Sequence, residues 1–142
     1  MRSLEMARDY LYRARRCLRE ADLALRDGDA PGVVRRSQEA LELAAKALLR
    51  ALGIEYPRVH DVSDVLLEQS DRMPEEVRRR IREIAELVSE LAAVRGPAFY
   101  GYEREGIPPS EAFKMDYALK VHRRVVEYVE LIQKALSEHL EL

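Results

Sequence analysis

Residues 37–49 read Ser-Gln-Glu-Ala-Leu-Glu-Leu-Ala-Ala-Lys-Ala-Leu-Leu, and this stretch decides the fold. Leu41, Ala44 and Leu48 recur at spacings of three and four residues, which places them on one face of a helix. The alanines in the middle of the stretch let a neighbouring helix approach closely. A proline suits the first turn of this helix and a glycine follows its end. We therefore expect a helix over 30–52 at the centre of a bundle.

The same period recurs in the rest of the chain. It predicts long helices over 2–26, from Pro74 to before Gly96, and from Ser110 to the C-terminus, and a short helix over 61–70. The stretch between Gly96 and Ser110 is rich in proline and glycine and is expected to be a loop. No segment alternates with a period of two. The sequence thus predicts an all-α fold, an antiparallel up-down helical bundle of four long helices plus one short helix, in a single domain over 1–142.

Composition excludes several classes of protein. The net charge of −2 gives no general basic field for nucleic acid. Cys17 is the lone cysteine, and no Cys/His group has zinc-ligand spacing, so we expect no disulfide, no metal and no cofactor. Charges interrupt the apolar N-terminal stretches, which predicts a cytoplasmic protein with no membrane segment. Of the 24 basic residues 20 are arginine, and asparagine and threonine are absent, a composition typical of thermophiles.

Two parts of the chain resemble a known family, the HEPN domains (higher eukaryotes and prokaryotes nucleotide-binding) of small archaeal and bacterial proteins. One part is 37–49, followed by Gly53 and by 57–62. The other is 95–100, followed by a proline-rich loop and a long last helix. The resemblance spans nearly the whole chain. It implies a helical homodimer, often paired with an MNT-type nucleotidyltransferase in a toxin–antitoxin system.

Many members of that family are metal-independent ribonucleases whose active site, at the dimer interface, uses an arginine followed a few residues later by a histidine. Arg95 stands where this arginine belongs, but Tyr100, Gly101 and Tyr102 occupy the positions expected for the histidine. No histidine of the chain follows an arginine at that spacing. Tyrosine, with an ordinary pKa of about 10, is a poor base near neutrality. The sequence therefore departs from the family at the catalytic position.

Candidate site residues follow from these patterns. The weak catalytic candidates are Arg95, Tyr100, Tyr102 and His60. The candidates for a cleft or interface are Glu39, Lys46, His60, Arg95 and Tyr100. Each also has a structural interpretation: a Glu42–Lys46 pair on the helix surface, a locally bonded histidine at a helix entry, an arginine at a helix end, and tyrosines that pack the loop.

Three hypotheses for function remain after this reasoning. The leading one is a non-catalytic homodimer that binds a nucleotide, or that associates with an MNT-type nucleotidyltransferase. The second is a metal-independent ribonuclease toxin with a degenerate site, in which Arg95 and a tyrosine act with His60. The third is a scaffolding protein that binds neither nucleotide nor RNA.

Overall fold

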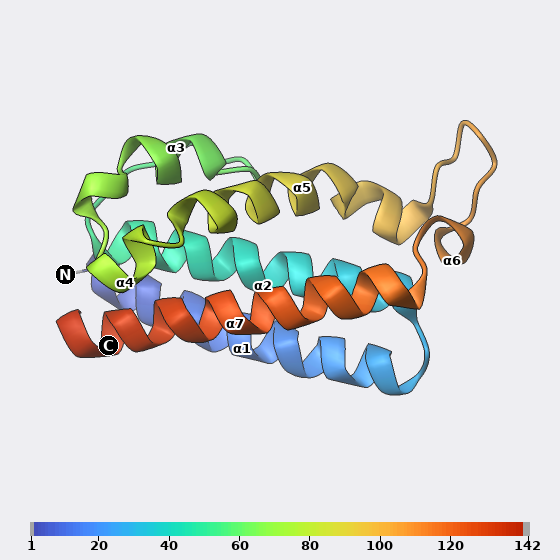
Figure 1. The fold of residues 1–142 in the computed structure, drawn as a ribbon, viewed down its shortest axis with the longest axis horizontal. Helices are drawn as coiled ribbons and strands as arrows, with labels where there is room; N and C mark the ends of the chain where they lie inside the picture. The colour runs from blue at the N-terminus through green and yellow to red at the C-terminus, as the bar shows by residue number, and fades with distance from the viewer. Residues whose placement is uncertain (1, 141–142) are drawn as a thin grey trace.

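The computed structural model describes residues 2–140, and within them the regular structure is helical. Four long helices span the molecule: α1 (Arg2–Arg26), α2 (Ala30–Ala51), α5 (Ile81–Tyr100) and α7 (Met115–Leu140). Between them lie three short helices and one 3₁₀ turn: α3 (Ser63–Glu68), η1 (Ser70–Arg72), α4 (Glu75–Arg78) and α6 (Pro109–Ala112). Figure 1 shows the long helices side by side, each reversing the direction of the one before it. The predicted all-α up-down bundle is confirmed.

The first two helices match the ranges expected from the periodicity. The chain turns between them at Gly28, which has a φ of 70°, a conformation that glycine adopts without steric cost. The side chain of Asp29 then caps α2, because its Oδ1 accepts a hydrogen bond from the backbone N–H of Gly32 at 3.0 Å. Pro31 occupies the first turn of α2, where its missing N–H costs nothing.

The core lies around α2, which contacts α1, α5 and α7. Its central alanines are fully buried, as the close approach of neighbouring helices requires: Ala40, Ala44, Ala45 and Ala47. Larger apolar residues of the other helices, such as Leu91 of α5 and Ile132 of α7, pack in the same core as these alanines. The expectation that 30–52 forms the central helix is therefore confirmed. None of the described helices combines the length and the apolar character needed to cross a membrane.

The prediction of one helix from Pro74 to before Gly96 is wrong in two respects: the helix is interrupted at Arg79 and Arg80, and it ends later, at Tyr100. After α4 the backbone leaves helical geometry at Arg80 (φ −110°), whose side chain bonds Glu83 and Glu127. The helix α5 then continues through Pro97 to Tyr100. Pro97 removes one internal hydrogen bond of the helix, because proline has no backbone N–H. The backbone N–H of the following Gly101 donates to the carbonyl of Pro97 at 2.7 Å, which closes the last turn.

The last helix also begins later than Ser110. Only α6 forms there, because Phe113 takes an extended conformation (φ −125°, ψ 113°) that places its ring in the core. The loop before α6 is a tight reversal in which Tyr102 and Ile107 pair through their backbones. The short helix expected over 61–70 is α3, followed directly by η1.

Candidate functional site

Three polar residues one turn apart on α2 form the floor of the candidate site. Glu42 accepts a hydrogen bond at Oε1 from Nε2 of Gln38 (2.7 Å) and at Oε2 from Nζ of Lys46 (2.8 Å). The spacing of four residues places all three side chains on one face of the helix. Only 14% of the Glu42 side chain is exposed, so this carboxylate is a largely buried charge that the protein itself satisfies.

His60 reaches this floor from the connection between α2 and α3. Its Nδ1 lies 3.0 Å from Oε1 and 3.1 Å from Oε2 of Glu42, while 55% of its side chain remains exposed. The next residue, Asp61, fixes the connection at two points. It accepts hydrogen bonds from the backbone N–H of Ser63 and from Oγ of Ser89 on α5, each at 3.0 Å. The loop that carries the histidine is therefore tied to both α3 and α5.

Arg95 completes the group from α5. Its Nε donates to Nε2 of His60 at 3.2 Å, and its Nη1 donates to Oε1 of Gln38 at 2.9 Å. Its own backbone carbonyl accepts a hydrogen bond from Nη1 of Arg35 at 2.7 Å. We use the name Arg95–His60 cluster for the set Gln38, Glu39, Glu42, Lys46, His60 and Arg95.

The hydrogen bonds of His60 define its tautomer. A guanidinium nitrogen can only donate, so Nε2 of His60 accepts and Nδ1 carries the proton toward Glu42. Burial of Glu42 on its own would raise its pKa, but the hydrogen bonds from Lys46, His60 and Gln38 outweigh burial and hold the pKa below its ordinary value. Glu42 is therefore ionised at neutral pH and orients the imidazole of His60.

Three guanidinium groups lie around Glu39, and one of them, Arg36, also lies 3.5 Å from a second carboxylate, Glu20. Its Oε1 accepts a hydrogen bond from Nη1 of Arg36 at 2.7 Å. Its Oε2 lies 3.7 Å from both Nε of Arg35 and Nη1 of Arg95. One carboxylate thus faces three guanidinium groups. Beside it, a cavity of about 210 Å³ is lined by Arg95 together with Cys17, Glu39, Glu42 and Leu43.

The two tyrosines predicted as catalytic candidates lie outside this cluster. Tyr100, at the end of α5, is 62% exposed and packs edge to face against Phe99. Tyr102 stacks on Phe113 in the loop, with ring centroids 6.4 Å apart. The structure thus brings Glu39, Lys46, His60 and Arg95 together and leaves both tyrosines elsewhere.

Sequence reasoning missed the parts played by Gln38 and Glu42. The four-residue spacing of Gln38, Glu42 and Lys46 was visible, but it indicated only a solvated pair on a helix surface. Their role depends on His60 and Arg95, which come from distant segments. A separate group, Glu76, Glu138 and His139, has possible metal-ligand atoms within 4.8 Å of one another, but it includes no residue of the cluster.

Fold and site together define a helical bundle with an arginine–histidine cluster beside its central helix. The family model described as HEPN domain matches residues 7–132, a range that contains the whole Arg95–His60 cluster. The chain belongs to the HEPN domain family. Neither the curated proteins nor the solved structures include a match to it.

Proposed function

We propose that this chain is a cytoplasmic, single-domain HEPN protein that binds a phosphate group of a nucleotide or RNA at the Arg95–His60 cluster without cleaving it. The observation that carries the proposal is the state of Arg95. Its Nε and Nη1 are held by His60 and Gln38, whereas its Nη2 has no hydrogen-bond partner among residues 2–140. A guanidinium fixed in this way, next to an exposed imidazole and with two more guanidinium groups around Glu39, suits a phosphate oxygen.

The arrangement of His60 favours binding over cleavage. Cleavage of RNA needs a base for the 2′-hydroxyl and an acid for the leaving oxygen. The lone pair on Nε2 of His60, which would act as the base, already accepts a hydrogen bond from Arg95. His60 is also the cluster's only imidazole, so one ring would have to serve both steps. These features support a binding role.

Calorimetry with AMP tests the binding role directly. Loss of a charged hydrogen bond of about 1.5–3 kcal/mol corresponds to roughly a 10- to 100-fold loss of affinity, which we expect for Arg95→Gln. Arg82→Gln is the matched control, because Arg82 is exposed on α5 and lies outside the cluster. The proposal fails if neither AMP nor RNA binds the wild type, or if Arg95→Gln binds both as tightly as the control.

We also propose that two copies associate and that the partner is an MNT-type nucleotidyltransferase in a toxin–antitoxin pair. Membership of the family supports the first part, because HEPN domains commonly dimerise. Light scattering after size exclusion should give twice the 16.4 kDa mass of the chain. Co-expression with the nucleotidyltransferase encoded beside it should yield a co-purifying complex. A monomer, or failure to co-purify, would contradict the corresponding part.

A metal-independent ribonuclease is the second candidate, and one observation favours it. The bond from His60 Nδ1 to Glu42 is the arrangement that would leave Nε2 as a base once Arg95 turned to a bound phosphate. The acid would then have to come from the second protomer. Wild type and Arg95→Ala should be compared on mixed single-stranded RNA in chelator-containing buffer, at matched dimer concentration. We expect no cleavage by either; cleavage that disappears in the variant would establish the ribonuclease instead.

A further inference from the structure

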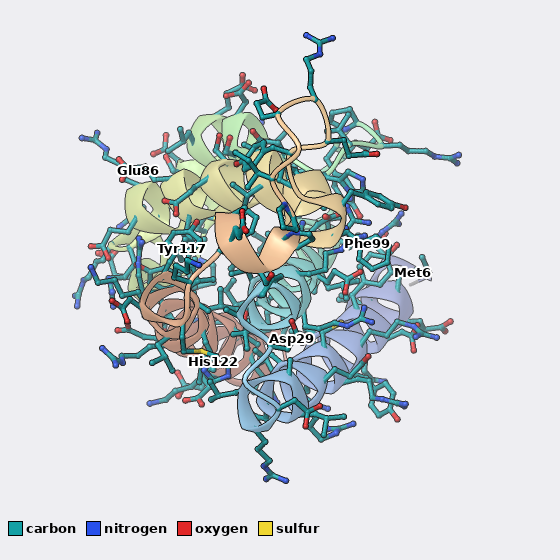
Figure 2. The ribbon with its side chains drawn as sticks, turned by 90° about the vertical axis from the view of Figure 1, so that its right-hand side faces the viewer. Met6, Asp29, Glu86, Phe99, Tyr117 and His122 are labelled. Atoms are coloured by element: carbon teal, nitrogen blue, oxygen red, sulfur yellow. The ribbon has the colours of Figure 1, made fainter. Side chains whose placement is uncertain are left out.

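Four separate cavities lie along α2. Residues of α2 at intervals of three or four line successive cavities: Arg35, Glu39, Glu42, Lys46 and Arg50. Most of the other lining residues come from α1, α5, α6 and the loop before α3. Figure 2 shows Met6 of α1 and Phe99 of α5, which line two of these cavities, on the side of the molecule away from Tyr117 and His122. We call this row of cavities the α2 groove.

The end of the α2 groove beyond Lys46 contains an arginine held by aromatic rings. The guanidinium of Arg50 lies 5.6 Å from the ring centroids of both Tyr10 and Tyr56, and its Nε donates to the hydroxyl of Tyr56 at 3.1 Å. Lys46 lies 5.7 Å from the Tyr56 ring. Arg50, Lys46 and Arg58 all line one cavity of about 450 Å³, and His60 lines it too. This cavity therefore adjoins the Arg95–His60 cluster.

The charges at this end of the groove are not neutralised by the protein. Elsewhere in the groove each cation has at least one carboxylate within 4 Å, although three arginines share Glu39: Glu42 pairs with Lys46, and Glu39 faces Arg35, Arg36 and Arg95. No carboxylate of residues 2–140 forms an ion pair with Arg50 or with the exposed Arg58. Aromatic rings hold the guanidinium of Arg50 in place without cancelling its charge. Such a pair of cations, one fixed and one exposed, is suited to an anion from solution.

We propose that Arg50 and Arg58 form a second phosphate subsite, so that the ligand of the α2 groove is a single-stranded polynucleotide rather than a mononucleotide. This inference rests on the proposed phosphate binding at Arg95. Arg50 lies twelve residues beyond Gln38, which Arg95 bonds, about 18 Å along the helix axis at 1.5 Å per residue. That length corresponds to roughly five stacked nucleotides at about 3.4 Å each. A strand whose phosphate contacts Arg95 can therefore place a later phosphate at Arg50.

Salt-dependent binding of RNA tests the subsite. The probe is a fluorescein-labelled 2′-O-methyl RNA of roughly ten nucleotides, a length typical of single-strand sites, which cannot be cleaved through its 2′-hydroxyl. Each phosphate contact on a single strand contributes about 0.7 to the slope of log affinity against log salt. Arg50→Gln should reduce the slope by about 0.7 and Arg50→Gln/Arg58→Gln by about 1.4. Arg50→Lys should retain the slope, and Arg82→Gln is the control.

AMP separates this inference from the proposed function, because AMP carries one phosphate. In the double variant the affinity for RNA should fall about tenfold more than the affinity for AMP, whereas Arg95→Gln should weaken both ligands. A wild-type salt slope in the double variant overturns the subsite and leaves binding at Arg95 intact. Equal losses for RNA and AMP overturn it as well. If the double variant instead loses its dimer, the groove holds a second copy of the chain, and the subsite is again refuted.

Absence of binding of both RNA and AMP by the wild type removes the proposed function, and the subsite with it. Weak binding of AMP with tight, salt-dependent binding of RNA is the result that the subsite predicts. The mass of each variant should be measured by light scattering at the concentrations of the binding assay. A variant that remains a dimer but binds RNA less tightly can then be distinguished from one that has lost its dimer.

Discussion

Replacing Glu42 with glutamine removes a negative charge from the floor of the Arg95–His60 cluster and keeps the shape of the side chain. An amide group in place of Oε2 presents N–H donors to Nζ of Lys46, so the 2.8 Å bond is lost and two donors face each other. A hydrogen bond to a charged group contributes about 1.5–3 kcal/mol. We expect Glu42→Gln to lower the free energy of unfolding by about 2–3 kcal/mol. At about 3 °C per kcal/mol for a chain of this size, the melting temperature falls by roughly 6–9 °C.

The loss of stability caused by Glu42→Gln should depend on pH. The folded-state pKa of Glu42 is held below its ordinary value of 4.5, so the ionised carboxylate stabilises the folded state above that pH. This stabilisation is lost as pH falls through the lowered folded pKa. Thermal melts of wild type and Glu42→Gln should therefore differ at pH 7 and converge as pH drops well below 4.5.

Glu86→Gln provides the matched control for this experiment. Glu86 is exposed on α5, as Figure 2 shows, and the same change there should alter stability by less than about 0.5 kcal/mol. An equal loss of stability for Glu42→Gln at neutral and acidic pH would refute the reasoning, since the loss would then not come from the charge.

Three further results are expected. Leu48→Ala, at a fully buried position of α2, should cost about 2–5 kcal/mol in urea denaturation, and a cost below about 1 kcal/mol would contradict the central place of this helix. Burial and nearby carboxylates raise the pKa of Cys17 to about 11, so roughly one thiol in a thousand is ionised at pH 8 and alkylation should be far slower in the native protein than in urea. Gly101→Ala should destabilise the protein more than Gly106→Ala does. Both glycines have positive φ, but an added Cβ at Gly101 would collide with the carbonyl oxygen of Ile107, whereas Gly106 faces open space; equal melting temperatures would argue against the observed reversal.

Helices were predicted best where a regular apolar period is bounded by residues that begin or end a helix, such as glycine and proline. The helices α1 and α2 follow their expected ranges, since the turn at Gly28 separates two regular apolar stripes. Prediction failed where tertiary contacts override local preference. The backbone of Arg80 is not helical, and its side chain bonds Glu127 of α7. Its guanidinium lies 5.3 Å from the ring centroid of Tyr128. No local pattern contains that information.

The candidate site was predictable as a set of residues but not as an arrangement. Arg95 and His60 stood out in the sequence, yet their separation of 35 positions gives no spacing rule for a contact. The contact depends on Asp61, which ties the loop to Ser89 of α5. Tyr100 was considered because of its distance from Arg95 in sequence. Because α5 continues through Pro97, Tyr100 lies about 140° around the helix axis from Arg95 and so on a different face.

Because α5 continues without interruption through Pro97, it also limits where residues can be inserted or deleted during evolution. Arg95 and Phe99 lie one helical turn apart, and Arg35 meets both, donating to the Arg95 carbonyl and lying 4.9 Å from the Phe99 ring centroid. Inserting or deleting one residue between them would rotate Phe99 by about 100° around the helix axis and separate it from Arg35. Insertions are absorbed more readily in the reversal at residues 103–106. Among relatives, we therefore expect the distance from Arg95 to Phe99 to be fixed, and length variation to gather just beyond α5.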